Sequence, residues 1–256
     1  MKAAVIFSVT IFSDALIYTI DEWLKIFESK FKDCDFYFGV NSGTKKEVFD
    51  KIKAAKINKI IIKSPLELYA TSDASGFQAA LFALKNERKK YDYYWFGHTK
   101  GGVNARESRR KYYISEFFNQ RDILEKEFLE KNIGVYGLHA VYKSSDNATY
   151  WNNYSGFFDH GNIPIASNIN FSDLTYEHVN TSFVETFFII NGKALNWFIE
   201  TAKDEWFFKK INNRYYFETV FPWLASRYGM STYIENQKDF LNPSVFLPKI
   251  QFTKKI

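Results

Sequence analysis

Residues 72–102, SDASGFQAALFALKNERKKYDYYWFGHTKGG, decide the fold because they join a helix pattern to a buried strand pattern. Residues 72–91 predict a helix with Ser72 or Asp73 at its N-cap. Residues 91–97, YDYYWFG, predict an aromatic strand. The strand ends in a corner of small and basic residues, His98-Thr99-Lys100-Gly101-Gly102.

The same alternation of strand and helix runs through the preceding residues. Buried strands are predicted at residues 3–10, 34–41 and 57–64, with helices at residues 14–31 and 44–56. Thr44 and Glu47 fit a capping box for the second of these helices. Four strands separated by three helices predict an α/β fold with a mostly parallel, Rossmann-like sheet covered by helices on both faces. Ligands of such sheets bind beyond the carboxyl ends of the strands, which are residues 8–10, 41–43, 64–75 and 98–102.

The second half of the chain is less regular. Helices are expected at residues 108–132, 193–211 and 216–229, and strands at residues 133–142 and 182–192. Residues 144–178 are polar, aromatic and too long for a simple connector, which indicates a substrate-side excursion. No Gly/Ser linker, repeat or low-complexity tract divides the chain, so one domain, 1–256, is expected.

Composition narrows the functional classes. The 256 residues carry a net charge of +5, which is compatible with an anionic ligand and too weak to indicate nucleic acid. A single cysteine, Cys34, excludes an internal disulfide and favours a reducing, cytoplasmic location. The N-terminus lacks a cleavage pattern, and no run approaches the about 20 apolar residues of a transmembrane segment. The dinucleotide and P-loop glycine motifs, HExxH, CxxC and GxSxG are all absent.

Three stretches resemble a family of glycosyltransferases. Residues 70–102 look like the nucleotide-sugar half of a GT-A type enzyme, with HTKGG standing where the strand usually ends in Asp-X-Asp. The His-Thr-Lys variant resembles the rhamnan-synthesis-F-like polysaccharide glycosyltransferases. FVETFFIINGKALNWF (183–198) and YYFETVFPWLASRYG (215–229) are similar to that group's later strand and its Glu-containing helix. Glu185 stands where the group often has Gly.

The resemblance implies a GT-A-like glycosyltransferase, with residues 1–105 as the nucleotide-sugar-binding half and 106–256 as the acceptor-side half. It would move a hexosyl or deoxyhexosyl unit from a nucleotide-sugar donor to a glycan or polysaccharide acceptor. A departing diphosphate needs positive charge, from a divalent metal or from protein cations. Because Asp-X-Asp is absent, two sources of this charge stay open. One is Mn²⁺ or Mg²⁺ with His98 as the one candidate ligand, and the other is basic side chains without a metal. The candidate donor and diphosphate contacts are Thr10, Asp73, Ser75, His98, Lys100, Gly101, Arg106 and Arg109.

Transfer also needs a group that takes the acceptor's proton. Glu185, Glu218 and His98 are the catalytic candidates, because both glutamates lie in apolar surroundings where a carboxylate is costly. Trp151 and Tyr154 could stack on an acceptor sugar or cover the core. Structural alternatives stay open: Asp73 as a helix cap, Arg106–Lys111 as a solvated helix face, and Glu185 paired with an arginine. A non-catalytic nucleotide- or sugar-binding protein of the same fold is the second functional hypothesis, and a phosphate-handling hydrolase is the third.

Overall fold

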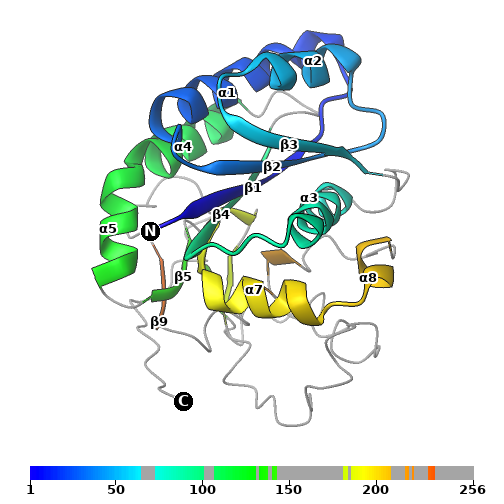
Figure 1. The fold of residues 1–256 in the computed structure, drawn as a ribbon. Coiled ribbons are helices and arrows are strands. Elements are labelled where there is room, and N and C mark those ends of the chain that lie inside the picture. Colours follow the sequence, from blue (N-terminus) through cyan, green and yellow to red (C-terminus); the bar gives the residue numbers. More distant parts are fainter. Residues whose placement is uncertain are drawn as a thin grey trace.

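The computed structural model describes residues 1–64, 73–100, 107–130, 133–137, 140–142, 181–183, 186–208, 217–218, 221 and 230–233. Within these residues the main feature is a seven-stranded sheet in the order β3-β2-β1-β4-β8-β5-β9 (Figure 1). Its strands are β1 (Ala3–Val9), β2 (Asp35–Val40), β3 (Asn58–Lys63), β4 (Tyr93–His98), β5 (Ile133–Gly137), β8 (Phe188–Asn191) and β9 (Met230–Tyr233). A two-stranded antiparallel pair joins β6 (Ala140–Tyr142) to β7 (Thr181–Phe183).

Strands β1 to β4 are parallel to one another. Strand β8 runs antiparallel between β4 and β5, and β9 is parallel to β5. The sheet is therefore mostly parallel with one reversed strand, and it confirms the predicted α/β, GT-A-like and Rossmann-like fold class.

Helices cover both faces of the sheet (Figure 1). One face carries α1 (Tyr18–Lys30), α2 (Lys46–Ala54), α4 (Glu107–Glu116) and α5 (Arg121–Glu130). A short 3-10 turn, η1 (Asp14–Leu16), precedes α1, and another, η3 (Phe118–Gln120), precedes α5. The other face carries α3 (Ala74–Glu87), α7 (Gly192–Thr201) and α8 (Asp204–Phe208). No helix in the described part of the chain has both the length and the apolar character that a membrane crossing needs.

Alternation along the central strand explains why two cores form. Val5 and Phe7 of β1 pack in the core beneath α1 and α2, whereas Ala4 and Ile6 pack beneath α3. Successive side chains of a strand point to opposite faces, so a strand that is apolar at every position requires cover on both sides. All seven residues of β1 are buried.

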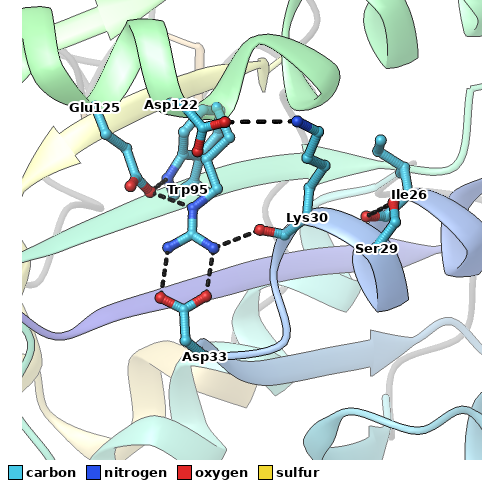
Figure 2. A network of polar contacts seen from close by, with 8 residues as sticks. Ile26, Ser29, Lys30, Asp33, Trp95, Asp122 and Glu125 are labelled. Carbon is cyan, nitrogen blue, oxygen red and sulfur yellow. Dashed lines mark hydrogen bonds and ion pairs between the residues drawn. The ribbon is translucent and has the colours of Figure 1, made fainter.

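A polar network anchors α5 to the sheet on the face that carries α1, α2 and α4 (Figure 2). The Arg121 guanidinium forms a bidentate pair with Asp33, donates through Nε to Glu125 at 2.8 Å and donates to the Lys30 carbonyl. Trp95 of β4 donates from Nε1 to the same Glu125 carboxylate at 3.0 Å. This network fixes α5, the end of α1 and the middle of β4 relative to one another.

Two local predictions were wrong in detail. The strand predicted at 182–192 is interrupted at Thr186, whereas the long helical region predicted from residue 108 is present as α4, η3 and α5. Thr186 adopts a left-handed φ of 56°, which a strand cannot continue through. The Thr44–Glu47 capping box does not form, because α2 begins at Lys46 and the Thr44 hydroxyl bonds the Val9 carbonyl instead.

Candidate functional site

The candidate site lies where the order of the strands reverses. The chain moves from β1 outward to β2 and β3, and then returns to place β4 on the other side of β1. Ser8 of β1 pairs in register with His98 of β4, so these two strands end at the same level. In open α/β sheets this switch point is where ligands bind.

The ends of β1 and β4 are joined by side-chain bonds as well as by the sheet. Thr99 donates its amide to the Ser8 carbonyl at 3.0 Å, and its hydroxyl bonds both the amide and the carbonyl of Thr10 at 2.8 and 3.2 Å. Both threonines are buried. The corner that follows β4 is therefore held rigidly as far as Thr99.

A cluster of small polar side chains fills the space between these ends and the start of α3. Asn41, immediately after β2, donates to the hydroxyls of Ser8 and Thr10 and accepts a hydrogen bond from Ser75. Ser8 in turn donates to the Asp73 carbonyl at 2.9 Å. Ser8, Thr10, Asn41 and Ser75 are all buried, so their hydrogen bonds hold the first turn of α3 against the strand ends.

Two glycines allow that close approach. A Cβ on Gly39 would lie 1.7 Å from the Gly76 carbonyl oxygen, and a Cβ on Gly76 would lie 2.2 Å from the Ser8 hydroxyl oxygen. The backbone of α3 is thus in direct contact with β1 and β2, which leaves no room for a side chain. Glycine is required here because of this contact, which brings residues 73–75 to the strand ends.

Asp73 occupies the N-cap position of α3, yet its side chain makes no capping hydrogen bond. Its Oδ1 accepts a hydrogen bond from the Thr10 hydroxyl at 3.3 Å, and its Oδ2 lies 3.0 Å from Nδ1 of His98. Burial raises the pKa of Asp73, but the charges of His98 and Lys100 and the Thr10 hydroxyl outweigh burial and lower the pKa below its ordinary value. Asp73 is therefore ionised at neutral pH and faces the end of β4.

The His98 ring is held between aromatic side chains. The Phe77 ring of α3 lies 6.4 Å from it and the Phe187 ring, just before β8, lies 5.0 Å from it, measured between centroids. Phe187 is itself stacked on Tyr113 of α4 at 3.9 Å. Only 6% of His98 is exposed, so its ring orientation is set by these neighbours and by Asp73.

The basic residues after β4 divide into two kinds. Lys100 is only 8% exposed, and its charge acts on Asp73, so it belongs to the site. Arg110 is fully buried, donates to Glu22 and lies over the Tyr18 ring, which makes it a structural cation of the α1–α4 contact. Lys111 pairs with Glu107 on the exposed surface of α4. Arg109 is half-buried on the same helix.

Glu218 is buried at 7% exposure and follows Phe217, whose ring lies 5.0 Å from that of Phe77. It therefore lies beside the aromatic cluster that contacts His98. The other predicted site residues, Gly101, Arg106, Trp151, Tyr154 and Glu185, lie outside the described residues.

The described residues do not form a set of metal ligands. No group of three or more His, Cys, Asp and Glu side chains converges in the part of the chain that the structure describes. The Asp73 carboxylate beside His98 has both oxygens engaged, by Thr10 and by His98 itself. A divalent ion of the Mg²⁺ or Mn²⁺ type prefers several oxygen ligands, which these residues do not supply.

The structure thus brings together Thr10, Asp73, Ser75, His98 and Lys100, five of the predicted contacts. It adds Ser8, Asn41 and Thr99, which had been placed only within segments at the strand ends. Their signal in the sequence is a polar residue at the end of a buried apolar strand or directly after it, as in FYFGVN. That signal is weak when taken alone, because polar residues follow most strands.

No known family's sequence profile matches the chain, and no curated protein matches it in sequence. Among solved structures the chain is similar to the mannosyltransferase Ktr4p from S. cerevisiae, with 11% identity and a TM-score of 0.34. The match covers 88% of this chain and 65% of that one, so the chain spans about two thirds of the enzyme's length. The likeness is too distant to transfer a residue's role from that enzyme to this chain.

Proposed function

We propose that the protein is a glycosyltransferase that moves a hexosyl or deoxyhexosyl unit from a nucleotide-sugar donor to a glycan or polysaccharide acceptor. In this proposal the chain is one domain of the rhamnan-synthesis-F-like type, with residues 1–105 binding the donor and residues 106–256 facing the acceptor. The proposal rests on the site at the ends of β1 and β4.

The observation that carries the proposal is a pair of buried basic side chains at the switch point. His98 and Lys100 are each less than a tenth exposed. Two basic side chains gathered at the switch point, with Asp73 beside them, suit an anionic ligand such as a diphosphate.

The chemistry asked of these residues is charge stabilisation. In the transfer the bond between the sugar C1 and the diphosphate oxygen breaks, and its electron pair stays on that oxygen. Lys100 and His98 offset the developing negative charge, and the amides of Gly101 and the guanidinium groups of Arg106 and Arg109 would add to it. Thr10 and Ser75 would line the nucleoside end of the same site.

The new bond forms when an acceptor hydroxyl oxygen attacks C1 and gives its proton to a base. Glu218 is supported for this role by its burial beside Phe217, next to the aromatic side chains that contact His98. Glu185 is the second candidate. Trp151 and Tyr154 would stack against the acceptor's sugar rings.

A donor-hydrolysis and transfer screen tests the proposal. The full chain is incubated with a panel of nucleotide sugars, with and without Mn²⁺, and released nucleoside diphosphate is measured. We expect release from one donor class, a loss of about 100-fold or more in Lys100→Met, and no change in the matched control Lys90→Met, whose partner Glu200 is on the surface. If the folded protein releases nucleoside diphosphate from none of the donors, the proposed glycosyltransferase activity is refuted. Nucleotide binding without release indicates the alternative, a non-catalytic nucleotide- or sugar-binding protein.

A further inference from the structure

The contact between Asp73 and His98 assigns a role to each nitrogen of the imidazole. Nδ1 of His98 is fully buried and lies 3.0 Å from Oδ2 of Asp73, within ion-pair distance, although the contact lacks regular hydrogen-bond geometry. A bare Nδ1 lone pair at that distance would be repelled by the carboxylate, so Nδ1 carries the proton. Nε2, on the far side of the ring, makes no hydrogen bond to a described residue.

Asp73 is itself fixed, which suits it to orient another group. Its carbonyl accepts from Ser8 and its Oδ1 accepts from Thr10. The contact between Gly39 of β2 and Gly76 of α3 holds the backbone three residues further on. A carboxylate held on both oxygens and at its backbone is poorly placed to meet a ligand directly.

We propose that Asp73 is a positioning residue that acts through His98: it keeps Nδ1–H turned inward and thereby presents Nε2 to a diphosphate oxygen. This deepens the proposed function and rests on it for the source of the diphosphate. A carboxylate that orients a histidine from behind is a recurrent arrangement in enzymes and metal sites. Here the oriented nitrogen would donate to a phosphate oxygen, next to the Lys100 ammonium.

The charge of Asp73 makes the proposal easy to distinguish from a simple electrostatic role. Asp73 at the start of α3 lies beside the His98 ring, and Lys100, which follows β4, acts on Asp73. Helix α3 and the segment before β8 contribute Phe77 and Phe187, and the buried Glu218 lies beside the same aromatic side chains. If Asp73 acted only as a negative charge near an anion site, its removal would strengthen anion binding. If it positions His98, its removal weakens binding although a repulsive charge has gone.

The first test observes the ring directly. The chain contains four histidines, so ¹⁵N-histidine labelling gives four imidazole signal sets, and His98→Gln identifies that of residue 98. We expect the Nδ1–H form or the imidazolium in the wild type, and a shift towards the Nε2–H tautomer in Asp73→Asn and Asp73→Ala. An unchanged His98 signal in both variants overturns the proposal.

The second test measures binding of inorganic pyrophosphate by calorimetry. We expect Asp73→Asn to raise the dissociation constant about tenfold, the scale of one charge-assisted hydrogen bond. In a His98→Gln background the same substitution should have no effect or should tighten binding, because the group it positions is missing. Asp92→Asn, the same change at the amino end of β4, is the matched control and should leave binding unchanged.

Tighter pyrophosphate binding in Asp73→Asn alone overturns the proposal, and so does a wild type that does not bind pyrophosphate. The outcome is separable from that of the donor screen. If no donor is turned over while the tautomer and pyrophosphate results hold, the glycosyltransferase function is refuted and the positioning role of Asp73 is supported.

Discussion

The contact between Gly39 and Gly76 makes the strongest stability prediction. In Gly39→Ala the new methyl group would lie 1.7 Å from the Gly76 carbonyl oxygen and 2.5 Å from its carbonyl carbon. Both atoms belong to the backbone of α3, so no flexible side chain can yield. Restoring an ordinary contact requires the start of α3 to retreat from β2 by more than about 1 Å.

The change in the free energy of unfolding has two parts, one from the folded state and one from the unfolded chain. Overpacking of a core costs about 1–3 kcal/mol, and a clash between backbones belongs at the upper end of that range. Replacing Gly by Ala returns about 0.4–1 kcal/mol by restricting the unfolded chain. We therefore expect the free energy of unfolding to fall by about 2 kcal/mol, measured by urea denaturation followed by circular dichroism.

The same movement should also weaken the site, because it pulls Asp73 and Ser75 away from Thr10 and Asn41. Pyrophosphate affinity should fall together with stability in Gly39→Ala. Ser75→Ala is the control: it removes the hydrogen bond to Asn41 without adding bulk, and should cost about 1 kcal/mol. A Gly39→Ala protein whose unfolding free energy stays within about 0.5 kcal/mol of the wild type would refute the close contact.

Three further predictions concern other parts of the structure. Burial raises the pKa of Cys34 to about 12, so the folded protein should resist thiol labelling at pH 8 until it unfolds. The thiol stays neutral in the folded state but ionises in the unfolded state above its ordinary pKa of 9.0. The free energy of unfolding should therefore fall as the pH rises above 9, and it should fall less in Cys34→Ala. Arg121→Lys should lower the free energy of unfolding by about 2–3 kcal/mol in urea denaturation, because lysine cannot bond Asp33, Glu125 and a carbonyl together; an effect below about 0.5 kcal/mol would contradict this. Thr186→Gly should raise the free energy of unfolding by about 1 kcal/mol, because glycine relieves the strain of the left-handed φ of 56°. It should also weaken pyrophosphate binding if the strain holds the ring of Phe187 against the site. A loss of stability would show that the buried threonine side chain contributes more than the strain costs.

The first half of the fold could be predicted because its signals are local. Each of the strands β1 to β4 is a short apolar run, and each helix between them has its own periodicity. The second half depends on pairings that periodicity does not encode. Nothing in FIIN indicates that β8 runs antiparallel between β4 and β5, and the break at Thr186 falls within a mostly β-branched and aromatic run, in which Glu185 is the one charged residue. Strand β9 was missed for the same reason.

The site could be predicted as a location but not as a set of contacts. Topology alone placed the ends of β1, β2 and β4 together, because parallel strands share one carboxyl edge. The Arg106–Lys111 run shows the limit of composition: Arg110 is buried against Glu22, whereas Lys100, which precedes the run, lies close enough to Asp73 to lower the pKa of that carboxyl. Which basic residue is structural depends on tertiary packing that charge patterning does not reveal.

Asp73 illustrates why the sequence could not choose between structure and function. Aspartate before a helix is the usual cap, and aspartate after a strand of this kind is a usual site residue, so both readings use the same residue at the same position. The structure separates them through geometry. Because Gly39 and Gly76 let the backbone of α3 touch the strands, the N-cap side chain lies within reach of His98 and turns to that ring instead of to its own helix. The same close packing that removes a capping bond from α3 therefore creates the Asp73–His98 pair, and a change that separates α3 from β2 should weaken stability and anion binding together.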